Sequence, residues 1–246
     1  GKSTEVRPPR DIDVLFELPA EVYHRFEKRP GNKQSQLLQE VKDVLGRTYS
    51  TSKIKGDGPV VLVAFTSYAV EVAPAFALES GGYFVCDTKD GGRYKKYHPK
   101  AEIEHVKTSN DRRNGNTRDL IRLMKCWQGC CSVDVKSFVL ELLAVEFLDS
   151  WPHAGNSSVY YDWMVRDFFA FMVQKSKSIL SCVTVPGTGE LLWLYGSAWQ
   201  SKAESAHGRA EKACKLEAES KPEDAWHEWV KVFGFEVPLQ ESASAF

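Results

Sequence analysis

The residues in this sequence with the clearest chemical potential are Asp11 and Asp13, at the start of a short apolar segment. Side chains alternate along a β-strand, so both carboxylates are expected on one face while Ile12 and Val14 enter the core. Two neighbouring like charges repel each other unless a cation neutralises them. Mg²⁺ prefers oxygen ligands and usually takes one or two carboxylates together with phosphates, which makes this pair a candidate metal site. The alternative for an isolated pair of this kind is a solvated turn.

A third carboxylate, Glu71, interrupts the apolar run of residues 70–76. If that strand lies beside the first, the three carboxylates form a cluster able to hold two metal ions. In such clusters one ion activates an attacking hydroxyl and the other holds a triphosphate. Taken alone, Glu71 is equally an exposed strand residue, so its role depends on how the two strands pair.

The elements that must position these carboxylates fall in the first 107 residues. Short β-branched and aromatic runs separated by Gly and Pro predict strands at 11–18, 60–66, 69–76, 83–87 and 93–97. Residues 35–45 carry apolar side chains at helical spacing, and the pair Gly91-Gly92 indicates a hairpin. We therefore expect residues 1–107 to form a sheet lobe, with one helix crossing between its first two strands.

Beyond residue 110 the apolar spacing changes to the period of helices, in segments 120–127, 138–147, 160–173 and 198–218. A stripe of alanines along the last segment predicts close helix packing, and residues 186–189 predict a tight turn before it. We expect a helical lobe over residues 108–239 and a mobile tail over residues 240–246. The fold class is therefore α+β.

Taken together, these segments resemble the bacterial cGAS/DncV-like nucleotidyltransferases (CD-NTases), the cyclic-oligonucleotide synthases of CBASS anti-phage defence. The similarity runs through residues 1–15, 70–76, 120–127, 136–141 and 196–199, so it spans both lobes. The two aspartates alone indicate only the wider polymerase-β-like superfamily, and the combination is more specific. The resemblance implies a polymerase-β-like sheet lobe packed on a C-terminal helical lobe, with the active site in the cleft between them.

The resemblance also implies an activity. Asp11, Asp13 and Glu71 would be the catalytic, metal-binding residues of an enzyme that uses two Mg²⁺ ions, with Mn²⁺ as a substitute. NTPs, ATP among them, would be joined into a cyclic di- or trinucleotide that activates a downstream effector, with release of pyrophosphate. In some such systems a ubiquitin-transfer-like partner conjugates the synthase C-terminus. In this sequence the conjugated segment would be the tail that ends at Phe246.

Four further residues match family positions that contact the nucleotide. Ser3, Lys125 and Ser137 would bind the triphosphate, which suits hydroxyl donors and a compact ammonium. Phe138 falls where relatives often place an aromatic side chain that stacks on a base. From the residues alone, Lys125 is equally a surface lysine and Ser137 equally a helix cap, whereas Phe138 is better interpreted as ordinary core.

One departure from the family concerns the start of the sequence. Family members carry a Gly-Ser pair at a helix N-terminus shortly before the two aspartates, where it holds the triphosphate. This sequence starts at Gly1, in what resembles the segment just after that pair. We expect it to lack one phosphate-binding element and the family's N-terminal helix. The lack of this phosphate-binding element favours one alternative function, a catalytically silent nucleotide-binding module.

Composition bounds the partners and the location. A formal net charge of -1 argues against an extended nucleic acid as a partner. A second alternative function is a nucleotidyltransferase that acts on RNA, on a protein or on a drug. The net charge weakens the RNA version of this alternative. Basic and aromatic residues alternate over 93–98, which suits RNA but more often marks an edge strand. The 6 cysteines lack zinc-site spacing and indicate reduced thiols, and no apolar run approaches a membrane span. We expect a cytoplasmic protein.

Overall fold

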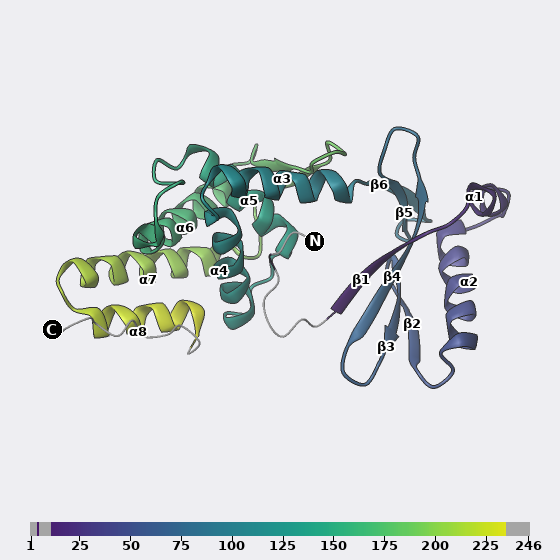
Figure 1. The fold of residues 1–246 in the computed structure, drawn as a ribbon, viewed down its shortest axis with the longest axis horizontal. Helices are drawn as coiled ribbons and strands as arrows, with labels where there is room; N and C mark the ends of the chain where they lie inside the picture. The colour runs from purple at the N-terminus through teal and green to yellow at the C-terminus, as the bar shows by residue number, and fades with distance from the viewer. Residues whose placement is uncertain (1–3, 5–10, 235–246) are drawn as a thin grey trace. The chain divides into compact units, whose positions relative to one another are not determined.

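The computed structural model describes residue 4 and residues 11–234. The chain divides into two compact units, one of Arg7–Glu102 and one of Gly1–Val6 with Ile103–Phe246 (Figure 1). We call them the sheet unit and the helical unit. The division falls within helix α3 (Pro99–Arg112), as does the boundary expected after residue 107. The expected tail at residues 240–246 lies outside the described residues.

The sheet unit contains a 6-stranded sheet in which β2-β3-β4-β5-β6 follow one another and β1 pairs with β4. The β1–β4 pairing is parallel, and the other pairings are antiparallel. All five predicted strands are present, and the predicted hairpin joins β5 to β6. The polar strand β2 has no apolar alternation and was not predicted. The bounds are β1 Asp11–Glu17, β2 Lys53–Asp57, β3 Val60–Ala64, β4 Ala69–Ala77, β5 Tyr83–Asp87 and β6 Arg93–Tyr97.

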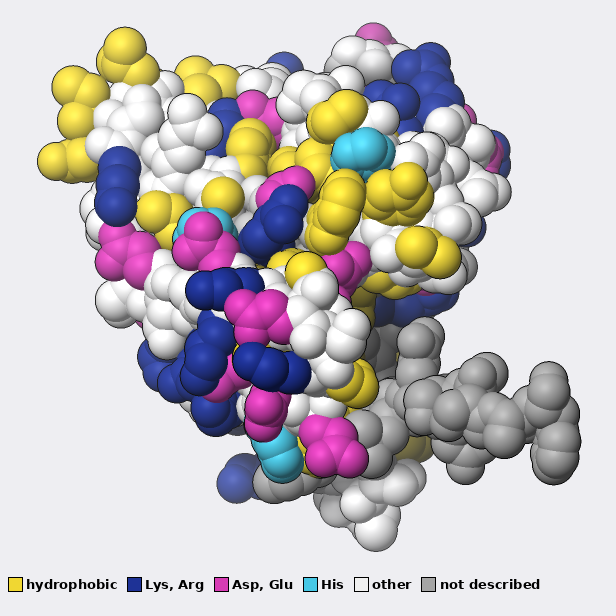
Figure 2. Space-filling view, turned by 90° about the vertical axis from the view of Figure 1, so that its left-hand side faces the viewer, with side chains coloured by type: hydrophobic (Ala, Val, Ile, Leu, Met, Phe, Trp, Pro, Cys, Tyr) yellow, Lys and Arg dark blue, Asp and Glu magenta, His cyan; other side chains and the backbone are white. Residues whose placement is uncertain are grey.

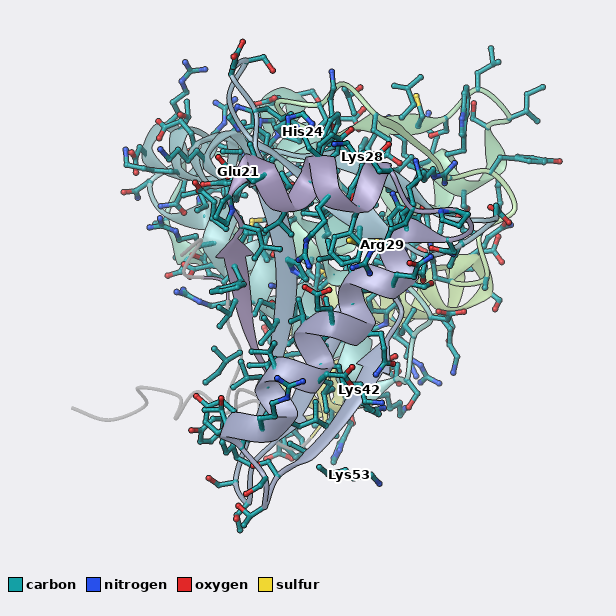
Figure 3. The ribbon with its side chains drawn as sticks, turned by 90° about the vertical axis from the view of Figure 1, so that its right-hand side faces the viewer. Glu21, His24, Lys28, Arg29, Lys42 and Lys53 are labelled. Atoms are coloured by element: carbon teal, nitrogen blue, oxygen red, sulfur yellow. The ribbon has the colours of Figure 1, made fainter. Side chains whose placement is uncertain are left out.

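Two helices, α1 (Ala20–Glu27) and α2 (Lys33–Thr48), connect β1 to β2, where the sequence predicted one. Figure 3 looks onto these helices, with Glu21 and His24 on α1 and Lys42 on α2. Asn32 caps α2 by accepting a 2.9 Å hydrogen bond from the backbone N–H of Ser35. The small core of this unit joins both helices to the sheet and includes Phe26, Leu37, Val61 and Phe76.

The prediction that Ile12 and Val14 enter the core is wrong. Their exposed fractions are 48% and 38%, whereas Val61 and Val63 on β3 are buried. Alternation sets which face of a sheet a side chain occupies, but burial also needs a covering layer over that face. In the described residues α2 covers β3, and Val14 instead lines an open apolar groove between β1, β4 and α2.

The helical unit contains the remaining helices and a two-stranded sheet. The predicted segments at 120–127, 138–147, 160–173 and 198–218 lie within or nearly coincide with α4, α5, α6 and α7. The turn at residues 186–189 closes a hairpin of two short strands that was not predicted. The bounds are α4 Asn116–Cys130, α5 Ser137–Ser150, η1 Ser158–Tyr160, α6 Tyr161–Lys177, β7 Cys182–Thr184, β8 Leu191–Trp193, α7 Gln200–Ala218 and α8 Pro222–Phe233.

Helix α5 lies at the centre of the larger core, because most of its side chains are buried and it packs on both α4 and α6. Helix α7 packs on α6 and α8. Its predicted alanine stripe, Ala203, Ala206, Ala210 and Ala213, is fully or almost fully buried, as close packing requires. None of the helices in the described part of the chain has the length and apolarity needed to cross a bilayer.

Candidate functional site

The carboxylates of the sheet unit meet at the pairing of β1 with β4. The parallel register sets Asp13 opposite Glu71 and Asp11 opposite Ala69. Register partners on adjacent strands share a face of the sheet and are separated by about 4.8 Å between strands. The strand pairing that the metal-site hypothesis required is therefore present. The side chain of Asp13 is exposed and that of Glu71 is half-buried. Both carry carboxylate oxygens, the ligands that Mg²⁺ prefers.

Strand β4 fixes the position of Glu71 from both sides. Its residue 71 is the register partner of Asp13 on β1 and of Leu62 on β3. Backbone pairing on two sides leaves little freedom for this segment, so Glu71 is held more firmly than a carboxylate on a loop would be. The metal-binding role of the three carboxylates remains a prediction.

The phosphate-binding candidates Lys125 and Ser137 lie on α4 and at the start of α5 in the helical unit. The Lys125 ammonium donates to Glu141 Oε1 at 2.8 Å and to Thr4 Oγ1 at 3.0 Å. The Ser137 hydroxyl donates to Gln128 Oε1 at 2.9 Å. Both polar groups are therefore held by side-chain hydrogen bonds.

These contacts form two adjacent links between α4 and α5. Lys125 and Gln128 are three residues apart on α4, and Ser137 and Glu141 are four apart on α5, so each pair lies on one helix face. At about 1.5 Å of rise per residue, the two links are separated by roughly one helical turn. A lysine ammonium and a serine hydroxyl at that spacing suit neighbouring phosphate groups of one triphosphate.

Two other predicted site residues have different outcomes. Phe138 is half-buried and packs against the core of the helical unit, which leaves its predicted base-stacking role untested. Ser3 lies outside the described residues.

The basic and aromatic strand β6 has the contacts of an edge strand. Arg93 and Lys95 form ion pairs with Asp87 at 3.0 and 3.4 Å. The backbone N–H of Lys89, with Arg93 and Lys95, holds the pKa of Asp87 below its usual value. Tyr94 packs against aromatic residues of the core of the sheet unit. Most of the basic and aromatic pattern is therefore used within the fold.

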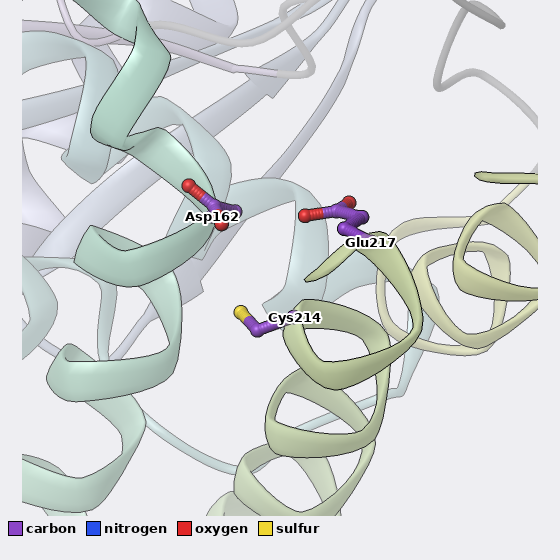
Figure 4. A group of neighbouring side chains, drawn as sticks. All are labelled: Asp162, Cys214 and Glu217. Carbon is purple, nitrogen blue, oxygen red and sulfur yellow. The ribbon is translucent and has the colours of Figure 1, made fainter. Parts of the chain in front are cut away.

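Sequence reasoning missed two arrangements of polar side chains. One is the set of partners of Lys125, namely Glu141 and buried Thr4. The other is Asp162 on α6 with Cys214 and Glu217 on α7, whose ligand atoms lie within 4.8 Å of one another (Figure 4). Only the three-residue spacing of Cys214 and Glu217 was visible in the sequence, because Asp162 is brought to them by tertiary packing.

The Asp162 cluster has a protonation pattern set by its surroundings. Burial raises the pKa of the Cys214 thiol to about 12, so it is neutral at physiological pH. Burial, with the nearby Asp162 carboxylate, raises the pKa of Glu217, which also accepts a 2.8 Å hydrogen bond from the Trp229 indole. Apart from this proximity, no feature among the described residues indicates an ion at this cluster.

Comparison with known proteins identifies the class of the N-terminal part. Residues 1–110 match the family model described as the Second Messenger Oligonucleotide or Dinucleotide Synthetase domain, SMODS. The matched residues contain the Asp13–Glu71 pairing.

Individual relatives extend the likeness to nearly the whole chain. A probable cyclic nucleotide synthase of Bacillus cereus (strain VD146) is 22% identical over 273 residues, covering 98% of this chain and 80% of the relative. The structure of E. coli MS115-1 CdnC with ATP matches with a TM-score of 0.71 at 19% identity, over 95% of this chain and 80% of CdnC. Vibrio cholerae DncV cyclic AMP-GMP synthase, solved with the linear intermediate 5′ pppA(3′,5′)pG, matches with a TM-score of 0.70 at 16% identity, over 95% and 66%.

At these identities the two solved structures establish the fold. The expected α+β nucleotidyltransferase fold and the resemblance to the CD-NTases are both confirmed.

Proposed function

We propose that this protein is a cyclic oligonucleotide synthase that joins NTPs, ATP among them, into a cyclic di- or trinucleotide and releases pyrophosphate. The observation that carries the proposal is the register of Asp13 with Glu71 within the residues that match the SMODS family model. The relatives support it, since one is named a probable cyclic nucleotide synthase and DncV was solved with a linear dinucleotide intermediate.

Asp11, Asp13 and Glu71 would hold two Mg²⁺ ions, or Mn²⁺ in their place, because adjacent carboxylates supply hard oxygen ligands. When bound, Mg²⁺ offsets the charge of the triphosphate and makes the attacking hydroxyl more acidic. The carboxylates orient the reacting groups in line, and we assign to Glu71 the acceptance of the hydroxyl proton.

Each transfer is a substitution at phosphorus. The 3′ or 2′ hydroxyl oxygen of one nucleotide forms a bond to the α-phosphorus of another, and the bond from that phosphorus to pyrophosphate breaks. A final transfer within the linear product closes the ring. Lys125 and Ser137, together with Ser3, would hold the triphosphate so that pyrophosphate departs opposite the attacking oxygen. Phe138 would stack on a base.

The proposed biological role is anti-phage signalling, in which the cyclic product activates a downstream effector. CdnC has been solved in complex with HORMA-deltaN, and a protein partner is part of this proposal for our chain as well. We also propose that a ubiquitin-transfer-like partner conjugates the C-terminal tail. Mass spectrometry of the C-terminal peptide from cells containing that partner tests this point, and finding only the unmodified peptide would count against it.

Synthesis is tested by incubating the full-length protein with radiolabelled NTPs and Mg²⁺, followed by phosphatase. A small product that resists phosphatase supports cyclisation, and its mass identifies the ring. Label that appears only on added RNA, protein or drug would instead support transfer to an external acceptor. Absence of any transfer would support a silent nucleotide-binding module. The double variant Asp11→Asn/Asp13→Asn should make no product, and continued synthesis by it would overturn the metal assignment.

A further inference from the structure

Lys125 is part of a three-residue hydrogen-bonded group within the helical unit. Its ammonium contacts Glu141 Oε1 at 2.8 Å and Thr4 Oγ1 at 3.0 Å, and the Thr4 hydroxyl donates to the same Glu141 oxygen at 3.2 Å. The Lys125 side chain is 14% exposed and that of Glu141 is 7% exposed. Thr4 is 3% exposed, so the group is largely removed from water.

A buried carboxylate needs a cation or several hydrogen bonds, because leaving water is unfavourable for an isolated charge. Lys125 supplies the cation for Glu141. Conversely, Glu141 determines where the flexible lysine side chain ends, because an ammonium with a buried partner has few other positions of comparable energy. The pair therefore fixes the position of the charge that we assign to triphosphate binding.

The ammonium retains capacity for a ligand. It carries three N–H donors, and the contacts to Glu141 and Thr4 account for two of them. The Lys125 side chain is 14% exposed, so it is not fully enclosed. A phosphate oxygen can thus be added to the existing contacts, and Lys125 does not have to leave Glu141 to bind it.

We propose that Glu141 is a positioning residue for nucleotide binding, which holds the Lys125 ammonium ready for a triphosphate and fastens Thr4 to the same point. The inference rests on the proposed function, because it presumes that Lys125 binds phosphate. It adds a role for a residue that acts through Lys125.

The expected effects follow from the loss of this order. In Glu141→Ala the lysine regains its rotamer freedom, which should weaken binding of a non-hydrolysable ATP analogue with Mg²⁺ by about tenfold. Glu141→Gln keeps an oxygen acceptor in place, so its affinity should stay within about threefold of wild type. Thr4→Val removes only the hydroxyl and should weaken binding by roughly threefold.

The experiment measures the dissociation constant by calorimetry and the melting temperature for each full-length variant. Lys125→Ala and the double variant Lys125→Ala/Glu141→Ala complete a cycle, in which the second substitution should weaken binding no further. Glu228→Ala is the matched control, because Glu228 is equally buried, with 7% side-chain exposure, and is paired with Lys212 and Lys231 on α7 and α8. It should lower stability and leave the affinity unchanged.

The outcomes separate this inference from the proposed function. If Lys125→Ala weakens binding while Glu141→Ala does not, Lys125 needs no positioning and only the present inference is overturned. If Lys125→Ala leaves the affinity unchanged, the inference falls together with the phosphate role of Lys125, and product formation still tests synthesis. Should Glu141→Ala fail to fold, unchanged affinity in Thr4→Val overturns the inference.

Discussion

Asp13 lies directly opposite Glu71 in the parallel pairing of β1 with β4. Two carboxylates in this relationship repel each other unless a cation lies between them, so each should be needed for metal binding. We predict that Asp13→Asn and Glu71→Gln each lower cyclic product formation by at least about a hundredfold. Product is measured by chromatography under saturating NTP and Mg²⁺. Glu17→Gln is the matched control, because it changes a carboxylate at the other end of β1, opposite Ala75.

Metal binding by Asp13 and Glu71 should also be detectable in stability measurements made without nucleotide. Mg²⁺ or Mn²⁺ that binds only the folded state stabilises that state, so the melting temperature rises with the cation concentration. Titration should therefore stabilise the wild type more than Asp13→Asn, and a chelator should reverse the effect. Equal stabilisation of both proteins would mean that the cation binds elsewhere.

The second prediction concerns the hydroxyl of Ser137, which donates to Gln128 at the start of α5. Ser137→Ala should raise the KM for NTPs several-fold, by roughly 1 kcal/mol of lost hydrogen bonding, and change the melting temperature little. Ser150→Ala removes a hydroxyl from the last residue of the same helix, where it donates to the Phe147 carbonyl. If both variants have the wild-type KM, Ser137 is a structural residue only.

Much of this arrangement could be predicted from local pattern. The strand that carries Asp11 and Asp13 and the strand that carries Glu71 are each visible as apolar runs, and the helices of the second unit have clear periodicity. What the sequence did not contain was the register, since any shift by two residues would have kept the same faces but set Asp13 against Ala69 or Ala73. Pairing between distant strands is decided by the whole sheet.

The failed expectations have a common physical origin in tertiary context. Ile12 and Val14 alternate as core residues do, but helix α2 packs on β2 and β3 and leaves these two side chains exposed. Glu141 was part of a recognised segment, yet nothing local indicated that Lys125 and Thr4 would meet it. Contacts between residues far apart in sequence depend on packing, which periodicity does not encode.

The third prediction uses two adjacent glycines in the β5–β6 hairpin. Gly91 and Gly92 have φ angles of +88° and +90°, so alanine at either position is strained by about 1–2 kcal/mol. A Cβ at Gly91 meets no atom within 4 Å, whereas one at Gly92 would lie 2.4 Å from Asn32 Oδ1 and 2.5 Å from Gln34 Oε1. Gly92→Ala should therefore destabilise the protein more than Gly91→Ala in urea denaturation. Equal losses would show that Asn32 and Gln34 move aside freely.

The face of the helical unit in Figure 2 shows basic and acidic side chains interspersed rather than gathered by sign. Glu228 on α8 is the most strongly surrounded carboxylate of α7 and α8, with Lys212 at 2.6 Å, Lys231 at 2.9 Å and Arg209 at 3.6 Å. The hydrogen bonds from Lys212 and Lys231 lower the pKa of Glu228 from 4.5 to about 2. This carboxylate therefore links the two C-terminal helices through its charge.

The fourth prediction follows from the sign of that shift. A folded-state pKa below the unfolded value means that the unfolded chain binds the proton more readily, so acid favours unfolding. The contribution of Glu228 is fully present above pH 4.5 and is lost as pH falls towards about 2. Glu228→Gln should be less stable than wild type at neutral pH and approach wild-type stability as the pH falls through this window. Glu223→Gln changes an exposed carboxylate in the first turn of the same helix and should keep the wild-type pH profile. A constant difference between wild type and Glu228→Gln at all pH values would show that shape, and not charge, makes Glu228 stabilising.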